Sequence, residues 1–471
     1  MAVEAAEDGR ATAWFLWGSA IYFLIQALQR LLLGGTLEVD EAEMVLLADG
    51  WHWGYGPQLP LYNWAQVLTF TLFGKTVAGL ALLKGLVLWL AGAGMWFAMR
   101  AAFGGGRAAA AAALSLAFLP NVLWEFQRAS SHSIALLAAV TWTLWAWFRL
   151  MSHQRGADWL LFGLILGLGG LSKANFWAVP AGLIVASIGY WPRPVGWRGP
   201  VMAAAVAALI VAVPYGWAVM NPDQSLASVH KFYQPDTGPW PWLAGLGLLS
   251  GSVVAALALP ALIGGAIWAL GARGRLVGWS NASRILLRAA ALSLVVAAVL
   301  VVAFEVTKIQ ARWLVPVYIF VTAAVFARLG ASLSPRAFRF IPVMALVCAG
   351  VTVLGMTQVR LESGRTATLD LTPLSLLVDK LAPDRIEGDY FLAGNLEILE
   401  PIRDTAVFGT MARTGVEGSG ADGLRVLNLG PMSVLPAGVQ VLDAGELDLG
   451  YQGAPDKRYH VDWQLIGLSG D

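Results

Sequence analysis

Eleven stretches of the chain are apolar over close to 20 residues, the length that crosses the roughly 30 Å hydrocarbon core of a membrane as a helix. The composition agrees, because only 13% of residues are charged and 58% are hydrophobic, whereas about a quarter of the residues in soluble proteins are charged. The formal net charge of +1 gives no case for a nucleic acid partner. The sequence therefore predicts a polytopic α-helical membrane protein with spans near residues 12–33, 77–99, 107–124, 133–150, 157–172, 175–191, 199–219, 243–270, 285–305, 313–329 and 338–357.

Basic residues concentrate in every second connection between these spans. Cytoplasmic loops of membrane proteins carry an excess of lysine and arginine, so this pattern places the N-terminus in the cytoplasm. It places the 34–76 loop, the 220–242 loop and the C-terminus on the outer side of the membrane. The basic residues are Arg100, Arg107, Arg149, Arg155, Arg193, Arg198, Arg273, Arg275, Arg284, Arg288, Arg328, Arg336 and Arg339.

The chain changes character after Arg360, where polar residues and turn signals become frequent. We expect residues 1–360 to form the membrane part, with an external loop at 34–76, and residues 361–471 to form a small mixed α/β domain on the outer side of the membrane. Short apolar runs suggest strands at 389–394, 423–429, 438–445 and 459–468, and helices at 374–382 and 396–402. No catalytic motif occurs in this part, so a structural cap or a platform that guides the acceptor is expected.

The connection after the first span is long and acidic, and it carries Glu38, Asp40, Glu41, Glu43 and Asp49. One interpretation is structural: Asp40 and Glu43 would form a capping box at the start of a helix. The other is catalytic, because a carboxylate held at a helix start beside the membrane can act as a general base. Asp40 and Glu41 are the candidates for this role. Paired acids could also hold a divalent cation, although no cofactor is firmly predicted.

Two glycines and two prolines between residues 54 and 64 predict a defined turn after the acids. The turn could simply separate two helices at the membrane surface. Alternatively its polar and aromatic side chains face the acids, in which case Tyr55, Gln58 and Asn63 line a substrate pocket.

Several cations fall on the predicted outer side, where the ordinary explanation for any single one is a side chain that reaches from a helix end into water. Together they would suit an anionic lipid head group. His132 is either an interfacial histidine or part of the same pocket, and no second histidine or cysteine stands at zinc-ligand spacing. The cations are Arg128, Lys173, Lys231, Lys308 and Arg312.

The chain resembles the bacterial glycosyltransferases of family 39, whose relatives include protein O-mannosyltransferases and the aminoarabinose transferase of lipid A. The resemblance lies in DEAEMVLLADGWHWGYGPQLPLYNWAQVLTFTLFG (Asp40 to Gly74), SSHSIALL (Ser130 to Leu137), LGLGGLSKANFWAVPAG (Leu166 to Gly182) and RWLVPVY (Arg312 to Tyr318). It implies the C-type glycosyltransferase fold, a polyprenyl-phosphate-linked sugar as donor and a lipid, glycolipid or protein hydroxyl as acceptor, with inversion at the anomeric carbon.

The resemblance also suggests individual roles. Asp40 matches the expected base, with Glu41 beside it, and Lys173 and Arg312 match basic positions of the family's motifs. Two positions differ: Gln58-Leu59-Pro60-Leu61 stands where many relatives have Lys-Pro-Pro-Leu, and His132-Ser133 stands where an aspartate is frequent. The missing lysine implies that other cations hold the phosphate. The Trp-Trp-Asp signature of oligosaccharyltransferases is absent.

Two other classes of function compete with the enzyme. A transporter or flippase for a lipid or small solute would be favoured by ionisable residues near the middle of the membrane and by repeated halves. Here the charges gather towards one face, and no repeat relates the halves. A structural scaffold would leave the acidic loop unexplained. The sequence therefore favours a membrane glycosyltransferase with no nucleic acid partner.

Overall fold

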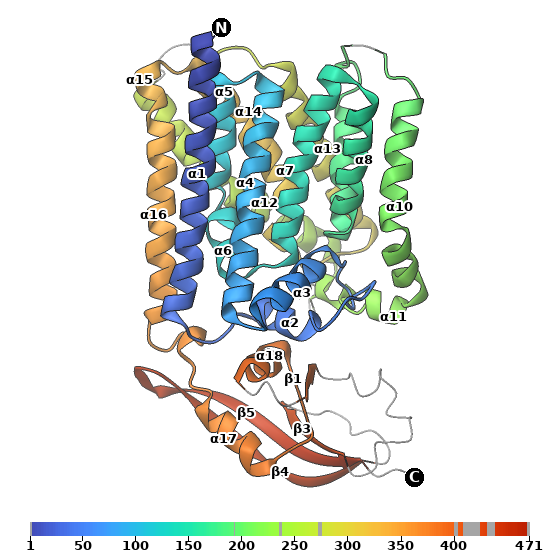
Figure 1. Cartoon of the computed structure of the whole chain (residues 1–471), viewed down its shortest axis with the longest axis vertical. Coiled ribbons are helices and arrows are strands. Elements are labelled where there is room, and N and C mark those ends of the chain that lie inside the picture. The colour runs from blue at the N-terminus through green and yellow to red at the C-terminus, as the bar shows by residue number, and fades with distance from the viewer. Residues whose placement is uncertain are drawn as a thin grey trace. The chain divides into compact units, whose positions relative to one another are not determined.

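The computed structural model describes residues 2–192, 194–234, 238–271, 276–399, 404–407, 424–430 and 439–468 (Figure 1). The chain forms two compact units. The helical unit comprises Met1–Ile25, His52–Tyr62 and Lys84–Thr352, and the sheet unit comprises Gln26–Trp51, Asn63–Leu83 and Val353–Asp471. The helices α1 (Ala2–Leu33), α4 (Val77–Phe103) and α16 (Phe340–Leu361) contribute residues to both units. A domain boundary at residue 360 stays a prediction.

Each predicted span coincides with helical structure. Within the described residues, eight helices are long and apolar enough to cross a membrane, a ninth candidate is bent, and two apolar helices are shorter. The long ones are α1, α4, α7 (His132–His153), α10 (Arg198–Met220), α12 (Pro241–Gly271), α13 (Asn281–Ala303), α14 (Val315–Ser332) with the 3₁₀ turn η5 (Ala311–Leu314) before it, and α16 with α15 (Pro335–Phe338) before it. The short ones are α8 (Gly156–Gly170) and α9 (Ala178–Ala186), the latter following η3 (Ala174–Trp177).

The predicted span at 107–124 is broken rather than straight. It consists of α5 (Gly106–Leu114) and η1 (Ser115–Phe118), followed by η2 (Asn121–Glu125) and α6 (Phe126–Ala129), and the two halves meet at 64°. The break falls at Leu119-Pro120, where Leu119 is extended with ψ of 120°. Proline lacks the N–H of a helical hydrogen bond and disfavours the helical conformation of the preceding residue, so the helix must end there.

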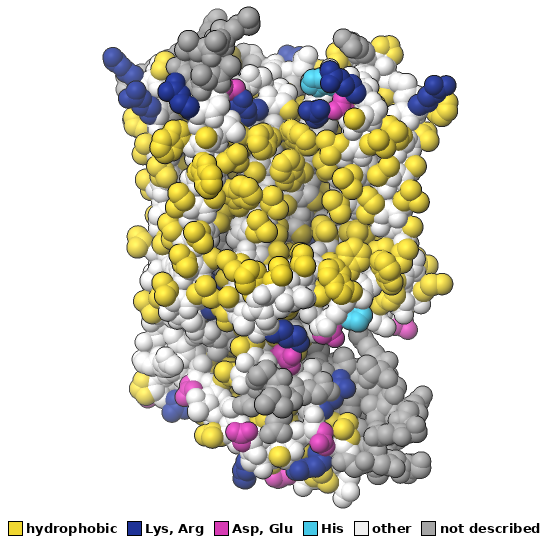
Figure 2. Space-filling view, in the orientation of Figure 1, with side chains coloured by type: hydrophobic (Ala, Val, Ile, Leu, Met, Phe, Trp, Pro, Cys, Tyr) yellow, Lys and Arg dark blue, Asp and Glu magenta, His cyan; other side chains and the backbone are white. Residues whose placement is uncertain are grey.

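Packing in the helical unit is graded from an inner to an outer layer. Helix α14 contacts α5 and α13, and α8 contacts α7 and α10. In an 18-residue apolar stretch of each span, 78% of the residues are buried for the span that includes α14, against 6% for α1. The outer helices expose leucine and valine, and Figure 2 shows these side chains as a belt around the unit. An apolar belt of this kind is what a helix bundle presents to lipid.

Lysine and arginine side chains gather beyond this belt, at the end of the helical unit that carries the start of α1 (Figure 2). Contacts tie the basic connections together there: Arg107 donates to the carbonyl of Leu333, and Arg328 Nε donates to the carbonyl of Val277 at 2.7 Å. Of the predicted basic residues, Arg193, Arg273 and Arg275 lie outside the described residues. The cytoplasmic location of this end stays a prediction.

The sheet unit contains a five-stranded mixed sheet of order β2-β1-β3-β5-β4. Strand β1 pairs in parallel with β2 and β3, whereas β5 pairs antiparallel with β3 and β4. The bounds are β1 (Arg385–Gly388), β2 (Asp404–Val407), β3 (Arg425–Leu429), β4 (Val439–Tyr451) and β5 (Ala454–Leu468), with helices α2 (Val39–Leu47), α3 (Leu61–Phe73), α17 (Thr372–Leu381) and α18 (Tyr390–Leu399). The predicted small α/β part is thus confirmed.

A hydrophobic core joins α17 and α18 to the sheet, with Leu374, Leu396, Leu427 and Leu465 almost fully buried. The strand expected at 389–394 is wrong, because these residues begin α18. The helix starts here because the carboxylate of Asp389 accepts the N–H of Leu392 at 2.7 Å. An aspartate in this arrangement caps a helix and satisfies one of its free N–H groups.

Candidate active site

The start of α7 is a buried polar turn. Ser130, Ser131, His132 and Ser133 are each less than 5% exposed. The hydroxyl of Ser131 lies 3.1 Å from His132 Nδ1, and the ring of Tyr62 lies 5.8 Å from the imidazole. Because α7 runs from His132 to His153, this turn lies a whole helix length away from the basic connection that follows His153. A polar cluster is therefore built into the end of the helical unit opposite the arginines.

Lys173 extends from the turn between α8 and η3 towards this cluster, and its Nζ donates to Ser133 Oγ at 3.1 Å. The turn is tight because Gly169 has no side chain: a Cβ there would lie 2.2 Å from the ring of Phe176. The sequence therefore places a half-buried lysine where two short helices meet. A charge at such a place in a membrane protein is expensive unless it faces a cavity or a partner.

Arg312 belongs to the same cluster. The side-chain amide of Asn175 donates to the carbonyl of Trp313 at 3.1 Å, which joins the Lys173 turn to the Arg312 turn, and Gln310 Oε1 accepts from Arg312 Nε at 2.7 Å. Lys173 and Arg312 both lie close enough to His132 to act on it electrostatically. The structure thus brings together three of the predicted site residues, and two cations in one partly buried place favour an anionic ligand.

The segments that carry Lys231 and Lys308 adjoin this cluster. The N–H of Lys308 donates to the carbonyl of Phe232 at 3.0 Å, and the ring of Phe232 lies 4.9 Å from that of Trp313. Both lysines are exposed. They provide positive charge at the surface beside the Arg312 turn, without the buried contacts that fix Lys173.

Arg128 lies in α6 and pairs with Glu125, with Nη2 and Oε2 3.7 Å apart. Its carbonyl accepts from Lys84 Nζ at 3.2 Å. Lys84 is 8% exposed, and the prediction missed it. The available signal was a single lysine within the apolar run of residues 77–99, because an ionisable residue inside a membrane helix is by default a functional candidate.

The predicted turn with two glycines and two prolines is confirmed. Tyr55 and Gln58 pair through their backbones, Gly56 has a φ of +63°, and the Tyr55 hydroxyl accepts the N–H of His52 at 3.1 Å. The N–H of Leu61 donates to the carbonyl of Leu171 at 3.1 Å, so the turn is fastened to the segment just before Lys173. Tyr55 and Gln58 therefore belong to the helical unit with the cations.

The acids belong to the sheet unit. The predicted capping box at Asp40 and Glu43 is wrong: Glu38 is the N-cap of α2, and Glu41 Oε2 accepts the N–H of Glu38 at 3.1 Å. The acidic run Asp40 to Glu43 lies inside the first turns, because the helix begins earlier than expected. Asp40 is half-buried in the first turn of α2.

Glu41 has a structural environment. It is 4% exposed, and its Oε2 lies 3.1 Å from Arg30 Nη2 and 3.8 Å from Arg360 Nη2. Arg30 and Arg360 are themselves nearly buried and also bind the backbone before α2. Glu41 is thus engaged in a buried ion pair with two arginines, so Asp40 is the better candidate for the base. Asn63 is fully buried in α3 of this unit.

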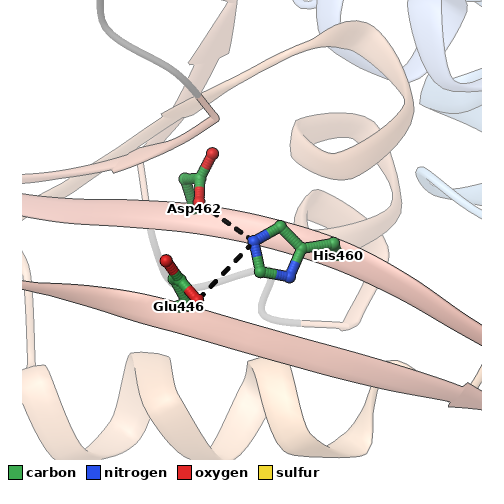
Figure 3. Close-up of side chains that lie close together, drawn as sticks. All are labelled: Glu446, His460 and Asp462. Atoms are coloured by element: carbon green, nitrogen blue, oxygen red, sulfur yellow. Dashed lines mark hydrogen bonds and ion pairs between the residues drawn. The ribbon is translucent and has the colours of Figure 1, made fainter.

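A divalent cation would need free ligand atoms. Glu41 is occupied by its two arginines, so the Asp40–Glu41 pair fits a metal poorly. Among the described residues, the group that could hold an ion is Glu446, His460 and Asp462 on β4 and β5, shown in Figure 3. His460 Nδ1 lies 2.9 Å from Asp448, and its Nε2 lies 3.2 Å from Asp462. These contacts are exposed ion pairs that raise the pKa of His460, with the Asp448 hydrogen bond as the main cause.

Comparisons with known proteins agree with this architecture. Residues 56–217 match the sequence model of the family described as dolichyl-phosphate-mannose-protein mannosyltransferase. Two relatives from Rhizobium johnstonii are named lipopolysaccharide core galacturonosyltransferases. RgtB is 28% identical over 82% of this chain and 81% of its own, and RgtA is 29% identical over 81% and 79%.

Solved structures show the same fold. ArnT from Cupriavidus metallidurans in the apo state matches 97% of this chain and 98% of its own, with a TM-score of 0.61 and 16% identity. The same protein bound to undecaprenyl phosphate matches with a TM-score of 0.59 and 15% identity over the same shares. The chain therefore shares its fold with ArnT and is similar in sequence to glycosyltransferases, which agrees with the resemblance to family 39.

Proposed function

We propose that the protein transfers a sugar from a polyprenyl-phosphate donor to a hydroxyl acceptor on the periplasmic side of the bacterial inner membrane. The observation that carries the proposal is the convergence of Lys173 and Arg312 on the buried turn at His132. Two fixed cations can bind the phosphate in the ground state and stabilise the charge that develops when it leaves. That the fold of ArnT accommodates undecaprenyl phosphate supports a donor of this kind.

The orientation follows from the same residues. The cluster lies at the end of α7 opposite the basic connections, and the positive-inside rule puts those connections in the cytoplasm. The N-terminus is then cytoplasmic, and the donor head group, the cations and the C-terminal domain face the periplasm. Lys231, Lys308 and Arg128 would attract the head group, while Tyr55, Gln58 and His132 would contact the sugar.

The chemical step needs one base and one leaving group. The acceptor oxygen attacks the anomeric carbon and forms the new glycosidic bond, and the bond between that carbon and the phosphate oxygen breaks. The lipid phosphate leaves with the electron pair and is held by Lys173 and Arg312. Asp40 takes the proton of the acceptor hydroxyl. This step requires Asp40 and the cations to share one pocket, which stays a prediction.

The names of the two bacterial relatives bear on the substrates. Both are galacturonosyltransferases that act on the lipopolysaccharide core, which supports a glycolipid acceptor and galacturonic acid as the first sugar to test. The relatives are transferases, so the transporter alternative gains no support from them.

The base is tested with purified protein in detergent, undecaprenyl-phosphate galacturonic acid as donor and lipopolysaccharide core as acceptor, with the mannose-linked donor in a parallel reaction. Asp40→Asn should lower the transfer rate by about 10²–10⁴-fold, the usual contribution of a general base, while the protein stays monodisperse. A near-normal rate in this variant would reject Asp40 as the base. Counterflow of the lipid in proteoliposomes without any transfer would favour a flippase.

The phosphate site is tested by binding of undecaprenyl phosphate, measured by native mass spectrometry. Lys173→Gln should weaken binding about tenfold or more, because a hydrogen bond to a charged group contributes about 1.5–3 kcal/mol. Lys380→Gln is the control, since Lys380 is an exposed lysine in the last turn of α17 and has no proposed role in lipid binding. Equal losses in the two variants would show that the lipid binds elsewhere.

A further inference from the structure

The C-terminal helix α18 makes two close contacts with the segment that carries Asp40. The first is made by Asn395, which is 4% exposed. Its Oδ1 accepts the N–H of Leu37 at 2.8 Å, and its Nδ2 donates to the carbonyls of Leu37 at 3.4 Å and Phe391 at 2.8 Å. One amide side chain thus binds both backbone groups of Leu37, three residues before Asp40.

The second contact follows Asp40 by two residues. A Cβ at Gly394 would lie 2.5 Å from the carbonyl oxygen of Ala42 and 2.7 Å from its Cβ, so α18 and α2 touch backbone to backbone. Only glycine permits this approach. The contacts of Gly394 and Asn395 therefore bracket Asp40 along the chain.

Helix α18 is itself firmly held, because Phe391, Leu392 and Leu396 lie in the core of the sheet unit. The segment before α2 has further attachments: Thr36 donates its hydroxyl to the carbonyl of Thr366 at 2.7 Å, and Arg360 Nη1 donates to the carbonyl of Thr36 at 2.7 Å. The position of the Asp40 helix is thus determined by residues more than 300 positions later in the chain.

We propose that Gly394 and Asn395 are positioning residues for transfer, and that the C-terminal α/β part serves to hold the Asp40 helix in its working geometry. The proposal rests on the proposed function, in which Asp40 is the base. A misplacement of about 1 Å at a reacting group can lower a rate by about 10²-fold. Small changes at these two residues should therefore act on the chemical step rather than on donor binding.

The first test compares Asn395→Ala and Gly394→Ala with Gly450→Ala, a control in the same unit where a Cβ would meet only Arg458 Nη1 at 3.8 Å. Both α18 variants should lower kcat by about 10–100-fold and leave KM for undecaprenyl-phosphate galacturonic acid within about twofold, while the control is unchanged. Asn395→Asp, which retains the acceptor for Leu37, should recover part of the rate. A rise in KM with unchanged kcat would overturn the proposal.

The second test separates this inference from the identity of the base. Amide hydrogen exchange of residues 37–47 should become about tenfold faster or more in Asn395→Ala, because a buried N–H loses its acceptor. In an Asp40→Asn background, Asn395→Ala should cause no further loss of kcat. Unchanged exchange refutes the positioning role whatever Asp40 does. An active Asp40→Asn variant with faster exchange refutes only the base.

Discussion

Asp40 and Glu41 are both candidates for the base from the sequence, but Glu41 lies in a buried ion pair, and exchanging each carboxylate for its amide distinguishes their roles. Glu41 is 4% exposed, and its two partners Arg30 and Arg360 have side chains 10% and 7% exposed. Glu41→Gln keeps the shape and can still accept the N–H of Glu38, but it removes the negative charge from the ion pairs with Arg30 and Arg360. Removing one partner of a buried ion pair costs about 3–5 kcal/mol.

The assay is thermal unfolding in detergent, followed by tryptophan fluorescence. For a domain of 150–250 residues, 1 kcal/mol corresponds to about 2–4 °C, so Glu41→Gln should lower the Tm of the sheet unit by about 6–20 °C. Asp40→Asn, which removes a carboxylate from the first turn of α2, should cost only about 0.3–1 kcal/mol while transfer is lost. Glu41→Gln should thus be recognised by its lower Tm, and Asp40→Asn by its loss of transfer.

One result would refute this reasoning. If Glu41→Gln keeps the wild-type Tm and still loses transfer, then the Glu41 carboxylate acts on the substrate and the arginines are not its essential partners. A supporting measurement is the double variant Glu41→Gln/Arg30→Met, which removes one of the uncompensated charges. Part of the lost stability should return, because the buried excess of positive charge is smaller.

Three further predictions concern other parts of the chain. Lys84→Met removes the donor to the Arg128 carbonyl and should weaken undecaprenyl phosphate binding, measured by native mass spectrometry. Unchanged binding would show that Lys84 has a structural role. Asp389→Ala should destabilise the protein by about 1 kcal/mol through the lost cap of α18, measured as the denaturant midpoint. The pKa of His460 is raised by Asp448, so its contribution to stability is complete below the unfolded pKa of about 6.5 and is lost as the pH rises through the folded value. The Tm difference between wild type and His460→Gln should therefore be larger at pH 5.5 than at pH 9, and a difference that grows with pH would contradict this.

The membrane architecture could be predicted from the sequence because it depends on local composition. A helix is the only single-segment structure that satisfies its own backbone in lipid, so each apolar run near 20 residues had to be helical, and each coincides with helix. The turn at Tyr55 and Gln58 was predictable for a similar reason, since glycine and proline restrict the backbone where they stand. The position of Lys173 at a tight turn between two short spans also followed from spacing alone.

Tertiary structure decided which side chains of distant segments contact one another. Glu41 and Asp40 are chemically alike and adjacent, and only the meeting of α2 with Arg30 and Arg360 gives one of them a structural role. The sequence suggested no link between the C-terminal part and the acidic loop, yet Asn395 binds Leu37 across 358 residues of chain. Local patterns specify which segments are helix or strand, whereas contacts between distant segments arise from packing that no window of neighbouring residues encodes. That is why the spans could be predicted by sequence alone, and why the support of the Asp40 helix emerged only from the folded chain.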